Sequence, residues 1–502
     1  MKKNVLALSI AAMVGGLGFA GAAAAQSTLT VNESGTGHIL VVPYYTAQNG
    51  NMSVFHLTNT DTQRGKAVKV RFRGASNSDD VLDFQVFMSP GDVWTAAVTA
   101  GDDGRAQLTT QDSTCTLPKI AAGVPVKFVT DRLSKKGWTD ANKAEQTREG
   151  YVEILSMADV PQGGSLYTAI KHKNGAAPDC TSSVLNATLN VAPIKANTGN
   201  YKLSTTTAAF DDLIPSRGGL AGSWYVINVA QTTTFSGATP AIVAGATPYN
   251  VFSPQKTGTA LLDSADPLMI GRVLAAQHYD VPDLSTPYAG AATAAAQAIE
   301  LTNALARTSV INQYANDASI SAKTDWVFSM PTRRYTIAAN YAAGDVNQDV
   351  AAIPAAGAAG DKTAYRFQNL GVTGNIFSTA ANTSVNDKGQ ICVEAQSQTF
   401  FDREERFEED GAIFSPGTVS KTQLCGEVSV LAFSGDNSAL AASVARQNVA
   451  APYTNGWGIV NFSEATPLLG AAFLKLSNPQ AAAGTSGTYG ITWPHAYVNA
   501  AQ

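Results

Sequence analysis

Ala67-Val-Lys-Val-Arg-Phe-Arg73 is the stretch of sequence that indicates the fold class most clearly. Its apolar side chains, Val68, Val70 and Phe72, alternate with three basic ones. A period of two residues is typical of a β-strand, because successive side chains of a strand point to opposite faces of the sheet. The stretch therefore predicts a strand that has one face in the core and one face in solvent.

Similar strand-like runs lie on both sides of this stretch. They are rich in β-branched and aromatic residues and cover residues 38–45, 51–58, 81–88, 150–155 and 223–229. We expect Pro43 to end the first run and turn residues such as Ser89-Pro-Gly-Asp92 to separate others. Closely spaced strands with short polar turns predict an antiparallel β-sandwich.

A helix-favouring, alanine-rich segment follows at about residues 288–316. Pro287 is well placed to begin it, and Ile299, Leu301 and Leu305 supply apolar side chains for packing. These apolar side chains favour a helix over the alternative, which is a flexible alanine-rich linker.

Strand-like runs resume after the helix, at residues 325–330, 427–433, 457–462, 471–476 and 489–493. The sequence therefore predicts a mainly β fold, with two β-sandwich-like antiparallel regions and one alanine-rich helical insert. We expect an N-terminal β-rich domain, a helical segment and a C-terminal β-rich domain, at residues 26–281, 282–324 and 325–502.

The N-terminus, residues 1–25, has the pattern of a secretory signal peptide. Lys2 and Lys3 supply a basic start, an apolar run interrupted by Gly and Ser follows, and Ala23-Ala-Ala25 fits the small-residue cleavage rule. The short apolar run disfavours the alternative, a transmembrane helix, and no later stretch offers about 20 uninterrupted apolar residues. We expect a secreted mature chain, residues 26–502, without a transmembrane segment.

The chain is poor in charge. Charged residues make up 15% of its 502 residues and the formal net charge is −5, whereas roughly 25% is typical of globular proteins. A protein that binds nucleic acid through a large basic field is excluded, because displacing phosphate counterions requires an excess of Lys and Arg. A surface with few charges also lowers the repulsion between copies of the chain, which favours extended packing.

The four cysteines are Cys115, Cys180, Cys392 and Cys425, and none belongs to a Cys-x-x-Cys motif. An even number in an exported chain favours two disulfides over the alternative of four free, buried thiols. Among the possible pairings, Cys115–Cys180 and Cys392–Cys425 close short loops at low entropic cost. We therefore expect these two bonds.

Calcium is the cofactor for which the sequence offers candidate ligands. Asp345, Asn347 and Asp349 have the spacing of the first three ligands of an EF-hand loop. The loop then departs from that pattern, because Val350 replaces the turn glycine and Ala356 replaces the closing glutamate. The segment is either a looser calcium loop or a plain turn.

A second group of candidate calcium ligands, Glu408, Glu409 and Asp410, ends the densest charge run, Asp402-Arg-Glu-Glu-Arg-Phe-Glu-Glu-Asp410. The mixed signs of this run favour a solvated segment with local ion pairs. Calcium binding is the second interpretation, and a pair of carboxylates for glycoside cleavage is the third. Weaker acidic candidates are Asp79, Asp80, Asp83, Asp102 and Asp103.

The sequence contains no familiar catalytic motif. It lacks a Gly-x-Ser-x-Gly elbow, a His-Glu-x-x-His pair and a phosphate-binding loop, and its five histidines are far apart along the chain. Arg333 and Arg334 could hold a carboxylate or an anionic sugar, but an ion pair at a strand end is the plainer interpretation. We do not expect an enzyme; a secreted hydrolase stays as an alternative, since a triad can assemble from distant positions.

Several segments share a further pattern: Gly37–Tyr45, Leu57–Asp61, Val68–Ala75, Ser89–Trp94, Arg148–Ile154 and Trp326–Tyr335. Together they resemble a family of exported bacterial proteins described only as cell-surface proteins, of a surface-layer-like type. The resemblance extends more weakly to the end of the chain. It implies a location at the cell surface, outside the outer membrane, and a structural role, and it implies no active site.

The sequence as a whole predicts a structural cell-surface protein that assembles with itself into a surface layer (S-layer). An export signal and a charge-poor surface support this hypothesis. The alternative is an adhesin or glycan-binding surface protein, whose partner would be a cell-surface glycan.

Overall fold

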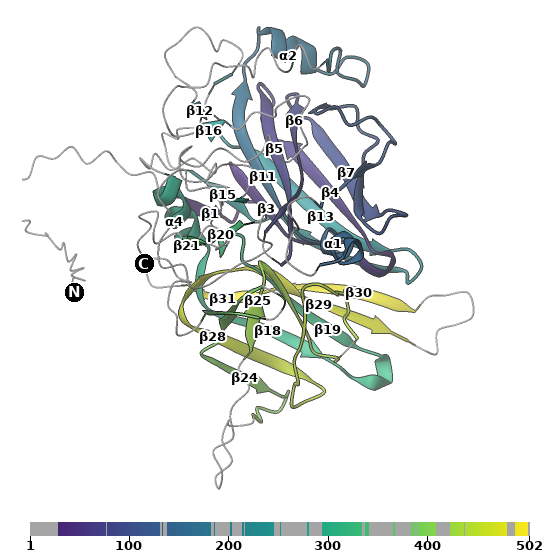
Figure 1. Ribbon diagram of the computed structural model, residues 1–502, viewed down its shortest axis with the longest axis vertical. Helices are drawn as coiled ribbons and strands as arrows, with labels where there is room; N and C mark the ends of the chain where they lie inside the picture. Colours follow the sequence, from purple (N-terminus) through teal and green to yellow (C-terminus); the bar gives the residue numbers. More distant parts are fainter. Residues whose placement is uncertain are drawn as a thin grey trace, which may run out of the picture.

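The computed structural model describes residues 29–76, 78–130, 133, 138–181, 185, 201–202, 213–214, 216–244, 251–252, 279–280, 294–333, 337–340, 365–366, 383–386, 388, 390–407, 422–435, 437–478 and 487–499. The fold of these residues is mainly β, as predicted, and its large sheets are antiparallel apart from one short parallel pairing. Figure 1 shows an N-terminal half above a C-terminal half, with the chain colour passing from purple to yellow between them.

Two seven-stranded sheets make up the N-terminal half. The first sheet contains, in spatial order, β1 (Thr30–Asn32), β15 (Ala241–Val243), β3 (Ile39–Thr46), β11 (Glu149–Val160), β5 (Gly65–Gly74), β6 (Asp80–Met88) and β9 (Cys115–Leu117). The second sheet contains β10 (Val126–Lys127), β8 (Ala106–Thr109), β7 (Val93–Ala100), β4 (Met52–Asn59), β13 (Leu220–Asn228) and β14 (Thr233–Ala238), with β2 (Thr36–Gly37) beside β13.

The core of the N-terminal half lies between these two sheets. Val68, Val70 and Phe72 of β5 are buried in it, as their alternation predicts. Phe72 meets Phe55 of the second sheet edge to face at a centroid distance of 5.5 Å. Aromatic pairs in this geometry stabilise the contact beyond the area that they bury.

The other face of β5 is not in solvent, and that part of the prediction is wrong. Lys69, Arg71 and Arg73 are at most 1% exposed, as little as the apolar residues between them. A two-residue period shows that the two faces of a strand differ in chemistry. It does not show whether the polar face meets water or other charges.

Pro43 does not end the first strand, because β3 continues through it to Thr46. The pairing of β3 with β11 shifts register between Gly150 and Val152, opposite the proline. Proline has no backbone N–H and is tolerated in sheets at such irregularities. The irregularity in β11 therefore lets the strand pass Pro43.

Two larger sheets and one small sheet form the C-terminal half. The third sheet contains β27 (Arg446–Asn448), β26 (Val428–Ala432), β19 (Lys323–Ser329), β29 (Leu469–Ser477) and β30 (Thr488–Pro494). The fourth sheet contains β24 (Ser397–Phe401), β28 (Asn455–Pro467), β18 (Ala306–Ala315) and β31 (Ala496–Asn499). The small sheet contains β22 (Thr383–Val385), β23 (Ile391–Glu394) and β25 (Gln423–Cys425).

The remaining described elements are short. They are the strand pair β12 (Tyr201–Lys202) and β16 (Val251–Phe252), the strands β17 (Tyr279–Asp280), β20 (Ile337–Asn340) and β21 (Tyr365–Arg366), the helices α1 (Asp140–Gln146), α2 (Ser165–Ile170) and α4 (Ala294–Leu305), and the 3₁₀ turns η1 (Gln48–Gly50) and η3 (Ala318–Ile320).

The alanine-rich helix is shorter than predicted. α4 ends at Leu305, and the following ten residues form β18. Val310 and Tyr314 are buried inside the C-terminal sandwich, whereas Gln313 between them is exposed. β-branched residues favour a strand here, and pairing with β28 and β31 completes it.

One hydrophobic cluster spans the N-terminal half and one face of the third sheet, and a second cluster fills the C-terminal sandwich. The third sheet turns Trp326 toward the fourth sheet and Phe473 toward the N-terminal half. Phe473 packs against Trp224 and Phe235, with centroid distances of 6.0 and 5.6 Å. Gly490 of β30 approaches the backbone of β14 so closely that a Cβ atom would clash there. The third sheet is therefore a shared layer of both halves (Figure 1).

Candidate functional site

A ladder of opposite charges lies on the face of the first sheet that turns away from the second. Arg71 of β5 is placed by register between Glu153 of β11 and Asp83 of β6. Arg73 forms ion pairs with Asp80 at 3.0 Å and with Glu153 at 3.3 Å. These charged groups are buried and are arranged so that each lies near a group of opposite sign, as buried charges require.

The ladder continues toward the start of β5, and a further buried ion pair lies at that end on the other face of the strand. Lys69 lies 3.7 Å from Asp83. Lys66 pairs with Asp159, and both side chains are fully buried. Burial raises the pKa of Asp159, and Lys66 opposes this shift. Within the described residues, this charge-poor chain therefore places many of its charged side chains in the interior.

The weaker calcium candidates Asp80 and Asp83 belong to this ladder, and Asp103 has cationic partners of its own. Asp80 and Asp83 face the cationic side chains of β5, and Asp79 is buried beside them. Asp103 holds Lys127 at 2.9 Å and Arg105 at 2.8 Å, and these partners hold the pKa of Asp103 below its ordinary value. Among the described residues, no three His, Cys, Asp or Glu side chains are grouped so that they could hold a metal ion.

The stronger calcium candidates, Asp345, Asn347, Asp349, Glu408, Glu409 and Asp410, lie outside the described residues. The described part of the charge run, from Asp402 to Phe407, is a solvated segment with local ion pairs, as predicted. Arg406 donates to the Asp402 carboxylate at 2.6 Å, and the side chains of Arg406 and Glu404 are 70% and 81% exposed.

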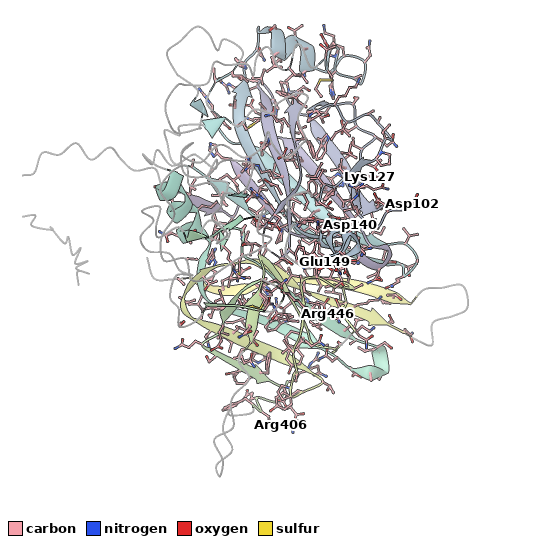
Figure 2. The ribbon with its side chains drawn as sticks, viewed as in Figure 1. Asp102, Lys127, Asp140, Glu149, Arg406 and Arg446 are labelled. Atoms are coloured by element: carbon pink, nitrogen blue, oxygen red, sulfur yellow. A yellow bond between two sulfur atoms is a disulfide. The ribbon has the colours of Figure 1, made fainter. Side chains whose placement is uncertain are left out.

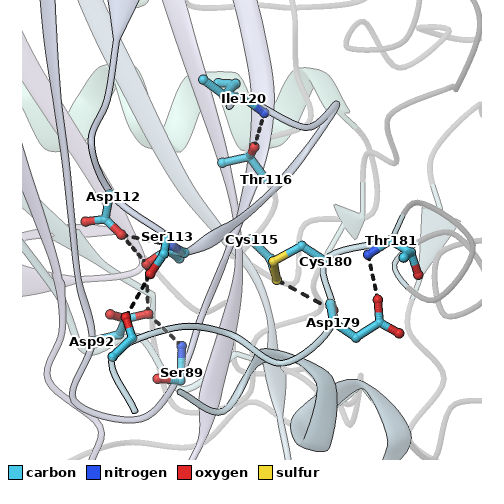
Figure 3. The surroundings of a disulfide bond; sticks show 12 residues. Ser89, Asp92, Asp112, Ser113, Cys115, Thr116, Ile120, Asp179, Cys180 and Thr181 are labelled. Carbon is cyan, nitrogen blue, oxygen red and sulfur yellow. Dashed lines mark hydrogen bonds between the residues drawn. A yellow bond between two sulfur atoms is a disulfide. The ribbon is translucent and has the colours of Figure 1, made fainter. Parts of the chain in front are cut away.

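Both predicted disulfides are present. Cys115 of β9 is bonded to Cys180, and Cys392 of β23 is bonded to Cys425 of β25. The second bond joins residues that are direct cross-strand partners. Figure 3 shows the first bond, beside which Asp179 accepts a hydrogen bond from the backbone of Thr181.

Arg333 is a structural residue in the described part of the chain. Its side chain is buried, and Nη1 donates to the backbone carbonyls of Leu424 and Gly426. Burial lowers the pKa of Arg333 to about 10, and the charge of Glu427 opposes this shift. Arg333 therefore holds the end of β25 against the turn after β19. Arg334 lies outside the described residues.

The outward face of the fourth sheet differs from these charged regions, and we call it the outer face. It consists of side chains that alternate with the buried ones along β24, β28, β18 and β31. Its members include Ile311, Thr399, Phe401, Trp457, Ile459 and Val498. None of these six residues is charged, and all of them are at least partly exposed.

A stacked aromatic pair stands at one end of the outer face. The rings of Phe401 and Trp457 are 4.2 Å apart at their centroids and nearly parallel, at 8°. Trp457 is 38% exposed, and Val498 on the opposite edge strand is 51% exposed. Exposed apolar side chains that form one patch mark surfaces that bind a partner. The outer face is therefore the candidate functional site.

Two buried carboxylates at the junction of the halves were not predicted from the sequence. The Glu149 carboxylate accepts backbone hydrogen bonds from Ser443, Val444 and Ala445 at 2.5, 3.3 and 2.9 Å. Burial raises the pKa of Glu149 to about 7 despite these donors. Figure 2 shows Glu149 on the N-terminal half, at the boundary with the C-terminal half.

Asp325 of β19 holds the other end of the same loop. It accepts hydrogen bonds from the Ser438 hydroxyl and from the backbone of Leu440, the latter at 2.9 Å. Burial raises the pKa of Asp325 to about 6. No motif marks either carboxylate, because the donors of Glu149 lie almost 300 positions later in the chain. Asp325 begins the strand-like run at residues 325–330, whereas Glu149 lies just before the run at residues 150–155.

Comparison with known proteins identifies no relative: no family model matches the chain, and no curated protein or solved structure is similar to it. In the part of the chain that the structure describes, no helix combines the length and the hydropathy needed to cross a membrane.

Proposed function

We propose that this chain is a structural protein of a cell surface, which associates with further copies of itself and uses the outer face as one contact. The observation that carries the proposal is a contrast in charge. The charges of β5, β6 and β11 are paired in the interior, whereas the six named residues of the outer face are uncharged and partly exposed.

A second copy is the occupant that fits this face best. The face is an uncharged sheet surface, and two such surfaces can pack at about 10 Å as they do inside a β-sandwich. A face that meets its own copy needs no complementary charge on a partner. Growth into a layer then requires at least one further contact, for which the edge strands β24 and β31 offer backbone groups.

Two features support a location outside the cell. Residues 1–25 have the pattern of a secretory signal peptide. The chain also carries two disulfides, which form and persist in oxidising compartments. Both features suit a protein of the outer cell surface.

Sedimentation velocity and light scattering of residues 26–502 test the proposal over a concentration series. We expect the average mass of the wild type to rise with concentration. Trp457→Glu and Val498→Glu each place a charge on the outer face, so the same mass should require at least a tenfold higher concentration. Each series is run with calcium and with a chelator, because the calcium candidates Asp345 and Asp349 lie in the same chain.

Val229→Glu is the matched control. Val229 is 72% exposed and follows β13, in the N-terminal half, so this variant should associate as the wild type does. A wild type that stays monomeric at all concentrations, with and without calcium, would contradict the proposal. A monomer that binds a cell-surface glycan would instead favour the adhesin.

A further inference from the structure

A small polar cavity lies where the second and third sheets meet. Its volume is about 100 Å³. β13, β14 and the turn between them form one wall, and β19, β29 and the loop after β26 form the other. Its polar lining residues are Asn51, Asn228, Gln231, Lys323, Ser438 and Lys475, together with Thr233.

The two lysines of this cavity are direct cross-strand partners. Lys323 of β19 pairs with Lys475 of β29 in the register of the third sheet. Like charges directly opposite one another destabilise a sheet. Among the described residues, no carboxylate lies within 4.0 Å of either ammonium group. Burial lowers the pKa of Lys475, and the charge of Lys323 lowers it further.

The nearby carboxylate of Asp325 does not neutralise this pair. Asp325 lies two residues from Lys323 on β19, and it accepts from the Ser438 hydroxyl and the Leu440 backbone. None of the residues that line the cavity is acidic. The cavity therefore has two lysines on one wall, and no acidic residue lines it within the described part of the chain.

Hydrogen-bond donors converge on the same space. Lys475 donates to Oε1 of Gln231, which fixes that amide beside the lysine pair. The Nε2 group of Gln231 makes no hydrogen bond within the described residues and stays available. The amide of Asn228 is already used, because its Nδ2 donates to Asn49 and Asn51.

We propose that Lys323, Lys475 and Gln231 bind a small oxyanion group, such as a carboxylate, a sulfate or a phosphate. The negative charge of such a group would relieve the repulsion between the two lysines, and its oxygens would accept from both ammonium groups and from the amide. The cavity has room for several water molecules, and so for a small oxyanion. That space suits a free oxyanion or the acidic group of a larger sugar whose remainder extends into solvent.

Calorimetric titration and thermal melting of the full mature chain, at a dilution that keeps it monomeric, test this site. The probes are sodium phosphate, sodium sulfate and sodium glucuronate, each compared with sodium chloride at equal ionic strength. Because phosphate and sulfate also stabilise folded proteins without a binding site, the deciding result is saturable binding in the titration. Saturable binding of phosphate or sulfate alone identifies a free oxyanion as the ligand, and saturable binding of glucuronate identifies an acidic sugar. No saturable binding of any of the three oxyanions would overturn the proposal.

Two variants make the test specific. Lys475→Gln and Lys323→Gln should each bind the anion at least tenfold more weakly than the wild type. In chloride, each should also melt at a higher temperature than the wild type, because the repulsion between the lysines is gone. Lys119→Gln, at an exposed lysine outside the cavity, should match the wild type in both respects. Wild-type affinity in Lys475→Gln and Lys323→Gln would overturn the proposal whether or not the outer face self-associates.

Discussion

At the scale of single residues, the buried charged groups of this chain are held by an opposite charge or by backbone hydrogen-bond donors. The pair formed by Lys66 and Asp159 is fully buried, and the Glu149 carboxylate is held by three backbone donors. Three donors favour the ionised form of a carboxyl group, whereas burial favours the neutral form. Burial has the larger effect at Glu149, and it raises the pKa of this group to about 7.

This shift predicts that Glu149 makes stability depend on pH. The pKa is higher in the folded chain than the ordinary value of 4.5. The contribution of Glu149 to stability is therefore complete below about pH 4.5 and is lost as the pH rises to about 7. Relative to Glu149→Gln, the free energy of unfolding of the wild type should fall by up to about 1.4 kcal/mol per pH unit in this window.

Urea unfolding between pH 4.5 and 7.5, the window set by the pKa of Glu149, measures this difference. Glu404→Gln is the control, since its side chain is 81% exposed, and its pH profile should follow that of the wild type. Parallel profiles for Glu149→Gln and the wild type would show that Glu149 does not titrate in this range.

At the scale of elements, strand pairing is reinforced by covalent bonds at two places. Cys392–Cys425 ties β23 to β25 and fixes their register, because the two cysteines are direct partners. Cys115–Cys180 ties β9, at the edge of the first sheet, to the segment after α2. Each bond holds an element that few other strands support.

Removal of either disulfide should destabilise the chain by a similar amount. The bonds close loops with sequence separations of 65 and 33 residues, and loop-closure entropy predicts a loss of about 4 kcal/mol for each. Because one loop is about twice as long as the other, its disulfide should stabilise the chain by only about 0.6 kcal/mol more. Urea unfolding of the paired variants Cys115→Ala/Cys180→Ala and Cys392→Ala/Cys425→Ala measures both values. A loss below about 1 kcal/mol in either case would contradict the entropic account.

At the scale of the whole molecule, the third sheet couples the two halves. One of its faces closes the C-terminal sandwich and the other packs on the N-terminal half. The loop that follows β26 is held at one end by Asp325 of the same sheet and at the other by Glu149 of the first sheet. A core shared in this way resists separate unfolding of either half.

We therefore expect the chain to unfold in one cooperative transition in scanning calorimetry. Phe473→Ala removes the ring that contacts Trp224 and Phe235, at a cost of about 3–5 kcal/mol, and should split the transition into two. Phe328→Ala removes a buried ring from the opposite face of the same sheet. It should lower the melting temperature and keep a single transition. Two transitions in the wild type would show that the halves are independent.

The sequence by itself determined the fold class and the covalent bonds. Alternation along β5 and its neighbours predicts a mainly β chain, because the period of side chains in a strand is a local property. The two disulfides followed from an even number of cysteines and from short loop lengths. The helix was foreseen but not its end, because pairing with β28 and β31 extends the strand structure back to Ala306.

Only the tertiary structure decided which polar faces meet water. The sequence predicts that Lys69 and Arg71 face solvent. In the structure they are buried, because strands β6 and β11 place Asp83 and Glu153 beside them. The outer face and the lysine cavity likewise combine side chains from strands that are far apart in the chain. Burial and charge pairing depend on these long-range contacts, and a local pattern carries no information about which strand lies on top of it.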